Sequence, residues 1–143
     1  MRIYWDANVF IRMVEGTDAV SSRLDAMLDP AAMTFDIVTS ELTLAELLVE
    51  PLRAGDRLRI AAYETLLTTH EAINVVSVDR PILTGAAHIR AAHSSTKLPD
   101  AIHIATAELA GCQIVLSADR RLPLRPALRR VSPDLTALNE LFD

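Results

Sequence analysis

The chain has 143 residues, 50% of them hydrophobic, and a formal charge of −5 at pH 7. This size allows one good core, so we expect a single domain over residues 1–143. The negative charge argues against a general nucleic-acid coat, because that kind of binding depends on many cations. No stretch approaches the roughly 18 apolar residues of a membrane span, and the one cysteine, Cys112, cannot form an internal disulfide. We therefore expect a cytoplasmic protein that has no contact with a membrane.

The first half of the chain alternates short apolar runs with stretches of helical periodicity. Ser40 is a good N-cap for a helix, and Pro51 and Gly55 punctuate the chain after that helix. The pattern predicts strands over 2–5 and 35–38, and helices over 8–14, 18–28, 41–49 and 57–69.

The second half continues the same alternation. Pro99 and Gly111 are strong start and end signals for one of its helices. The pattern predicts strands over 73–78 and 113–116, a short fifth strand over 129–131, and helices over 82–93, 99–110 and 133–141. Continuous apolar strands are typical of a sheet that is buried on both faces. The sequence therefore predicts an α/β fold in three layers, with a mostly parallel sheet of four or five strands flanked by helices.

Four acidic residues lie far apart in the chain at positions that this fold brings to one edge of the sheet. Asp6 and Asp119 follow predicted strands, and ligands of open parallel sheets bind beyond the carboxyl ends of the strands. Asp100 lies in the first turn of a predicted helix, and Glu46 lies on the helix that begins after Ser40. Carboxylates brought together resist ionising together, so a divalent cation is their natural neutraliser.

Each acid taken alone also fits a turn, a helix cap or a solvated helix position. Glu46 favours the metal-site interpretation because Leu44, Ala45, Leu47 and Leu48 place it within an apolar stretch. An unpaired charge in such surroundings is expensive.

Four segments of the chain resemble the PIN-domain family of metal-dependent ribonucleases, and within it the VapC toxins of bacterial toxin–antitoxin pairs. The likeness extends over almost the whole chain in order and spacing, and its most specific part is Leu-Pro-Asp-Ala-Ile-His-Ile-Ala-Thr-Ala. The four segments are Tyr-Trp-Asp-Ala-Asn-Val-Phe-Ile from residue 4, Thr-Ser-Glu-Leu-Thr-Leu-Ala-Glu-Leu from residue 39, Lys-Leu-Pro-Asp-Ala-Ile-His-Ile-Ala-Thr-Ala from residue 97, and Leu-Ser-Ala-Asp-Arg-Arg-Leu from residue 116.

The resemblance implies a PIN-like domain in which four acids hold Mg²⁺ or Mn²⁺. The matching residues are Asp6, Glu46, Asp100 and Asp119. Ser117 matches a hydroxyl residue often found near the ion. The chain departs from the family pattern at Asn8, where a small hydroxyl residue is frequent, and at Ala118, where asparagine is common. These departures leave the acidic set intact and concern the groups around it.

The resemblance further implies a hydrolytic endoribonuclease that is the toxin of a type II toxin–antitoxin system. A VapB-like antitoxin and a second copy of the chain are the expected partners, and RNA is the expected substrate. Our candidates for phosphate contacts are the arginines of the densest basic stretch, which lies close in sequence to Asp119 and comprises Arg120, Arg121, Arg125, Arg129 and Arg130. Arg120, Arg121 and Arg125 are the main candidates among them. A solvated or ion-paired role is equally compatible with each arginine. We interpret His103 as a packing residue at a helix boundary, and contact with the substrate is the alternative that stays open, since His103 follows Asp100 by three residues.

Two alternatives of the same fold remain open from the sequence. One is a housekeeping RNA-processing nuclease, and the other is a non-catalytic module that binds RNA or a partner. A phosphatase fits less well because Asp6-Ala7-Asn8 lacks the second aspartate of the common phosphatase motif. A phosphotransfer receiver would need a lysine late in the sheet, where this chain has arginines.

Overall fold

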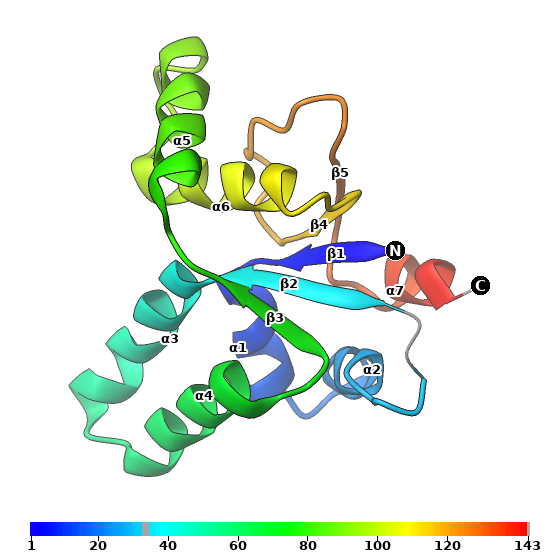
Figure 1. Ribbon diagram of the computed structural model, residues 1–143. Helices are drawn as coiled ribbons and strands as arrows, with labels where there is room; N and C mark the ends of the chain where they lie inside the picture. Colours follow the sequence, from blue (N-terminus) through cyan, green and yellow to red (C-terminus); the bar gives the residue numbers. More distant parts are fainter. Residues whose placement is uncertain (33–34, 143) are drawn as a thin grey trace.

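The computed structural model describes residues 1–32 and 35–142, which fold into a parallel sheet with helices on both faces (Figure 1). The strands are β1 (Arg2–Trp5), β2 (Asp36–Ser40), β3 (Ile73–Val76), β4 (Ile114–Leu116) and β5 (Arg129–Val131). The helices are α1 (Ala7–Glu15), α2 (Ala19–Met27), α3 (Glu41–Ala54), α4 (Arg57–Thr69), α5 (Arg80–Ala92), α6 (Leu98–Leu109) and α7 (Leu135–Phe142).

The sheet has the strand order β3-β2-β1-β4-β5, and each neighbouring pair is parallel. In the register, Ile3 of the central strand β1 lies opposite Ile37 on one side and Ile114 on the other. Parallel strands end at one common edge, so the segments after β1 and β4 lie side by side. The predicted α/β class and the parallel arrangement are confirmed.

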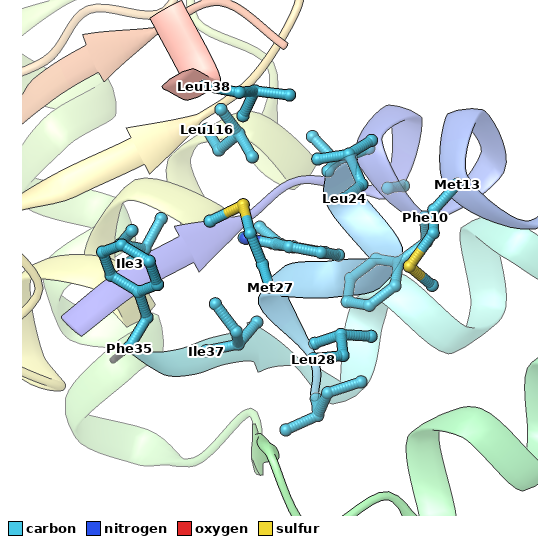
Figure 2. Close-up of a cluster of buried hydrophobic side chains, with 14 of the residues drawn as sticks. Ile3, Phe10, Met13, Leu24, Met27, Leu28, Phe35, Ile37, Leu116 and Leu138 are labelled. Carbon is cyan, nitrogen blue, oxygen red and sulfur yellow. The ribbon is translucent and has the colours of Figure 1, made fainter. Parts of the chain in front are cut away.

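Alternate residues of β1 separate the core into two parts. Tyr4 faces the cluster formed with α5 and α6, whereas Ile3 and Trp5 face the larger cluster on the opposite side of the sheet. Figure 2 shows this larger cluster, in which side chains of α1, α2 and α7 meet the sheet. Ile3, Tyr4 and Trp5 are fully buried, as expected for a strand that is covered on both faces.

The largest departure from the predicted elements is the end of α3. The helix was expected to stop before Pro51, but it continues to Ala54 with Pro51 inside it. Pro51 is buried, so packing of its ring offsets the backbone hydrogen bond that proline cannot donate. Gly55 ends the helix instead: its φ is 64°, and the Asp56 amide donates to the Pro51 carbonyl at 2.9 Å, as in a Schellman motif.

A polar contact between α1 and α4 supports the helical layer on the Trp5 side of the sheet. Glu15 accepts hydrogen bonds from the Tyr63 hydroxyl and, at 2.7 Å, from Arg59 Nη1. The bond from Tyr63, opposed in part by burial and assisted by Arg59, holds the pKa of the Glu15 carboxyl below its usual value.

We expect Glu15→Gln to remove a pH-dependent part of the stability. A lowered pKa means that ionised Glu15 stabilises the fold above the ordinary carboxyl range, and this contribution is lost as pH falls through the lower folded-state pKa. At pH 7 the variant should lose roughly 0.5–1 kcal/mol of unfolding free energy, a small value because about a third of the Glu15 side chain is exposed. Urea denaturation at several pH values measures the difference. If the difference in unfolding free energy between the wild type and Glu15→Gln does not shrink below pH 4, Glu15 is not the source of this pH-dependent stability.

Candidate active site

Asp6 lies immediately after β1 and caps the N-terminus of α1. Its Oδ1 accepts from the Ala7 amide at 2.8 Å, and its own amide donates to the Leu116 carbonyl at the end of β4. Its Oδ2 accepts from the Ser117 hydroxyl at 2.7 Å and from Asn8 Nδ2 at 3.0 Å. Both oxygens of Asp6 are therefore fixed, by the first turn of α1 and by the residue that follows β4.

Asn8 and Ser117 tie the loop after β4 to the first turn of α1. Asn8 Nδ2 also donates to Ser117 Oγ at 3.3 Å, while Asn8 Oδ1 accepts from the Ala118 amide at 3.1 Å. The Asp119 amide donates to Ser117 Oγ at 3.1 Å. The chain has alanine at position 118, where asparagine is common in the family. In this chain Asn8 supplies the amide side chain that contacts the loop after β4.

Asp119 is held by its neighbour Arg121. Asp119 Oδ1 accepts from the Arg121 amide at 2.9 Å and from Arg121 Nε at 3.3 Å. The backbone hydrogen bond is the main cause that holds the pKa of the Asp119 carboxyl below its usual value; burial opposes it, and the charges of Arg121 and Arg130 assist it. Asp119 is thus a carboxylate that stays ionised beside a cation.

Asp100 is within electrostatic range of the other three acids. It lies in the first turn of α6 and is partly buried. Burial, followed by the negative charges of Asp119, Asp6 and Glu46, raises the pKa of the Asp100 carboxyl, while His103 opposes the rise. The four acids that the sequence placed at one edge of the sheet therefore share one electrostatic environment.

Glu46 reaches this environment through His103. His103 is in the middle of α6, not at a helix boundary, and is 4% exposed. Its Nε2 bonds to Glu46 Oε1 and lies 4.0 Å from Asp6 Oδ1, while its Nδ1 bonds to the hydroxyl of Tyr4. An ionised carboxylate only accepts hydrogen bonds, so Nε2 carries a proton and donates it to Glu46.

The negative charges around His103 oppose the effect of burial on its pKa. Desolvation disfavours the imidazolium, but the hydrogen bond and the charge of Glu46, together with Asp6 and Asp100, outweigh it and raise the pKa of His103. Tyr4 is fully buried, and burial together with the charges of Asp6 and Glu46 raises the pKa of its hydroxyl. Tyr4 therefore remains a neutral hydrogen-bonding partner for the histidine.

The expected burial of Glu46 is wrong. Its side chain is 38% exposed, although its neighbours in sequence are apolar. On a helix, consecutive residues point in different directions, and the buried positions of α3 are Thr43, Leu47 and Pro51. Glu46 lies on the rim of the core, where His103 reaches it.

The donor set has the chemistry of a site for a hard cation. Carboxylate, hydroxyl and amide oxygens are what Mg²⁺ and Mn²⁺ prefer, and such ions commonly keep several waters. Within residues 1–32 and 35–142, however, no group of three or more His, Cys, Asp or Glu side chains is arranged to hold a metal ion. His103 engages Glu46 at Oε1, and Arg121 engages Asp119 at Oδ1.

The profile of the PIN domain family matches residues 3–127. The chain belongs to the PIN domain family. Its members are nucleases. The comparison with curated proteins found no match.

Solved structures with the same fold include several toxin–antitoxin proteins. A toxin–antitoxin complex from Klebsiella pneumoniae is 20% identical, with 92% of this chain and 98% of that chain covered and a TM-score of 0.67. VapBC2 from Rickettsia felis bound to a promoter DNA fragment is 12% identical, with 91% and 98% covered and a TM-score of 0.68. VapC20 from Mycobacterium tuberculosis, described as a Sarcin-Ricin loop cleaving toxin, is 18% identical, with 84% and 92% covered and a TM-score of 0.65. At these identities the likeness establishes the PIN fold.

The three arginines that the sequence singled out lie in different surroundings in this PIN domain. Arg121 lies at the acids through its contact with Asp119. Arg120 lines a neighbouring cavity of about 530 Å³ that also contains Asn8. Arg125 makes a two-point ion pair with Glu108, so a phosphate would have to compete with that carboxylate for it.

The contacts of three polar residues near the acids were not predicted from the sequence. His103 bonds to Glu46, Arg130 Nη1 donates to the Ser117 carbonyl at 2.6 Å, and Lys97 lines a cavity with Asp100 and Asp119. A signal for His103 was present, because residues three apart on a helix share a face and His103 follows Asp100 by three. Lys97 precedes Asp100 by three and carries the same signal.

No helix in the described ranges combines the length and the apolar character that crossing a membrane requires.

Proposed function

We propose that this PIN domain is a metal-dependent endoribonuclease, and that it is the VapC-like toxin of a type II toxin–antitoxin system. The observation that carries the proposal is geometric: His103 bonds to Glu46 and lies 4.0 Å from Asp6, while Asp100 and Asp119 line one cavity. The raised pKa of Asp100, which arises from burial and from the charges of Asp119, Asp6 and Glu46, agrees with it. Four carboxylates within one electrostatic environment are costly unless a cation joins them. In the proposed site, Asp6, Glu46, Asp100 and Asp119 hold Mg²⁺ or Mn²⁺.

A divalent cation held there would polarise the scissile phosphate and lower the pKa of a water that attacks it. Other residues of this chain orient the metal-binding acids and would supply positive charge near the reacting phosphate. Ser117 and Asn8 hold Asp6 in one orientation through its Oδ2, and His103 holds Glu46. Arg121, and with it Arg120 and Arg125, would supply positive charge for the RNA backbone around the acidic cluster.

The toxin role is supported by the fold neighbours. Structures of this fold are described as toxin–antitoxin complexes, and one is described as a toxin that cleaves the Sarcin-Ricin loop. We propose by extension a VapB-like antitoxin as partner, a homodimer as the assembly, RNA as the substrate and the cytoplasm as the compartment. In this proposal the whole chain, residues 1–143, acts as one PIN-like domain.

Chelation of divalent ions with EDTA should abolish RNA cleavage by the purified protein, and an excess of Mg²⁺ or Mn²⁺ should restore it. The same ions should raise the thermal unfolding temperature, because a ligand present at about 100 times its Kd stabilises the folded state by about 2.7 kcal/mol. Gel analysis of RNA ends and a thermal melt in each ion measure the two effects, with K⁺ at equal ionic strength as the control. Cleavage that persists in EDTA would contradict metal dependence. Stabilisation by the ions without cleavage would instead favour a non-catalytic binding module.

A further inference from the structure

The segment between β4 and β5, drawn in orange in Figure 1, is joined to α6 by a two-point ion pair. Arg125 Nε donates to Glu108 Oε1 at 2.7 Å, and Arg125 Nη2 donates to Glu108 Oε2. Arginine binds a phosphate through the same bidentate geometry. In the free protein, Glu108 therefore occupies the donors that Arg125 would offer to the backbone of an RNA strand.

The segment has other anchors besides this ion pair. Leu122 and Leu124 pack against the apolar cluster that contains residues of α6, and Leu128 is buried in that cluster. The Leu128 amide also donates to the Arg125 carbonyl at 2.9 Å, which closes a turn after Arg125. The Arg125 side chain itself is 50% exposed, so the ion pair can open toward solvent while the anchors hold the segment in place.

The ion pair lies along a path that starts at the acidic cluster. Asp119 stands near the beginning of the segment, and Asp100 lies in the first turn of α6. Glu108 follows Asp100 by eight residues on the same helix, a distance of about 12 Å along the helix axis. An RNA strand that leaves the acids along α6 would bring one of its phosphates to Arg125.

We propose that Glu108 is an internal competitor of the RNA backbone: it pairs with Arg125 in the free protein and releases Arg125 to a phosphate when RNA binds. The proposal rests on the proposed ribonuclease function. Because one anion replaces another at Arg125, Glu108 lowers the affinity for RNA that engages this arginine. An exposed ion pair is weak enough to be exchanged, and it changes a binding equilibrium by no more than about 5-fold. Glu108 thus limits RNA binding without belonging to the set of metal-binding acids.

Glu108→Gln should therefore bind RNA more tightly than the wild type. Glutamine keeps the length of the side chain and removes the charge that holds Arg125. Binding of a short labelled single-stranded RNA is followed by fluorescence anisotropy in EDTA, where no cleavage is expected. We expect the affinity to rise about 3- to 5-fold. The slope of log K against log salt should steepen by up to about 0.7, the value for one added phosphate contact on a single strand.

This gain should require Arg125. In a protein that already carries Arg125→Gln, adding Glu108→Gln should raise the affinity less than about 2-fold, because the group that Glu108 releases is absent. Glu50→Gln is the matched control, since it removes a carboxylate from an exposed ion pair with Arg53 on α3, on the opposite side of the sheet from α6 (Figure 1). It should leave the affinity and the salt slope close to those of the wild type.

An affinity of Glu108→Gln no higher than that of Glu50→Gln would overturn the proposal and leave the ion pair with only a role in docking the segment. An equal gain with and without Arg125 would also overturn it, because Glu108 would then repel RNA directly. Glu108→Ala provides a second removal of the carboxylate and should raise the affinity in the same direction. Urea denaturation of each variant confirms that the proteins compared are folded.

Failure of this proposal is distinguishable from failure of the proposed function. If the wild type binds and cleaves RNA in Mg²⁺ or Mn²⁺ but Glu108→Gln gains no affinity, only the role of Glu108 is refuted. If the wild type neither binds nor cleaves RNA, the ribonuclease function itself is refuted, and the role of Glu108 with it.

Discussion

Asp100→Asn should cleave RNA at least about 100-fold more slowly than the wild type, the size of loss that follows removal of one charge-stabilising group from an active site. Asp100 lines the cavity at the acidic cluster and interacts with each of the other three acids. Asparagine keeps the shape of the side chain and removes the negative charge that would hold a divalent cation. The rate is measured with purified protein in Mg²⁺ or Mn²⁺, by quantifying new RNA ends.

The same variant should be at least as stable as the wild type when divalent ions are absent. The pKa of the Asp100 carboxyl is raised in the folded protein, so at neutral pH its ionised form is less favourable in the folded state than in the unfolded state. Removing this charge relieves the repulsion from Asp119, Asp6 and Glu46. Loss of activity together with unchanged or raised stability in urea separates a role in the site from a role in folding.

Asp25→Asn is the matched control for this substitution. Asp25 is an exposed residue of α2. Its substitution by asparagine removes the same charge as Asp100→Asn, but at a position away from the acidic cluster. Controlled expression in bacteria adds the biological measurement: the wild type and Asp25→Asn should arrest growth, and Asp100→Asn should not. Cleavage at the wild-type rate by Asp100→Asn would exclude Asp100 from the site. RNA cleavage without growth arrest would favour the housekeeping nuclease over the toxin.

The strands and the positions of Asp6 and Asp119 could be predicted because their signals are local. A short apolar run that is buried on both faces indicates a strand of a parallel sheet, and a polar residue directly after such a run lies at the edge where the strands end. The N-cap at Ser40 is equally local, since its hydroxyl oxygen accepts from the Leu42 amide at 3.1 Å.

The end of α3 and the exposure of Glu46 could not be predicted from the same signals. Pro51 is normally a reason to end a helix, but its ring is buried in the folded chain, and this packing offsets the hydrogen bond that proline cannot donate. The apolar residues next to Glu46 are neighbours in sequence, but they point around the helix in different directions. Local hydrophobicity therefore overstated how deeply this carboxylate is buried.

The role of His103 depends on contacts across the chain. Tyr4 and Glu46 are 99 and 57 residues away from it, and no periodicity of the sequence brings these three groups together. The sequence could place His103 on the same helical face as Asp100. Only the folded chain reveals that its two ring nitrogens join a buried tyrosine of β1 to a carboxylate of α3.

This connection predicts that His103→Leu weakens the binding of Mn²⁺ about 10- to 100-fold, the effect typical of removing a group that orients a metal ligand. Leucine fills a similar volume but offers no donor to Glu46, so the carboxylate loses the contact that directs it toward Asp6. It also removes a partner of the buried Tyr4 hydroxyl, which should lower the unfolding free energy by roughly 1–3 kcal/mol. Affinity is measured by isothermal titration calorimetry at a temperature where urea denaturation confirms that the variant is folded.

Two further variants separate orientation of Glu46 from support of the core. His103→Gln keeps an amide N–H that can reach toward Glu46, so it should recover most of the affinity for Mn²⁺ while it still disturbs the contact with Tyr4. Tyr4→Phe removes only the hydroxyl and should lower stability more than metal affinity, because the bond between His103 and Glu46 remains. His88→Leu, at an exposed position of α5, controls for the loss of a histidine elsewhere. If folded His103→Leu binds Mn²⁺ as tightly as His88→Leu does, the orientation of Glu46 does not depend on His103, and the contact between them serves only the packing of α3 against α6.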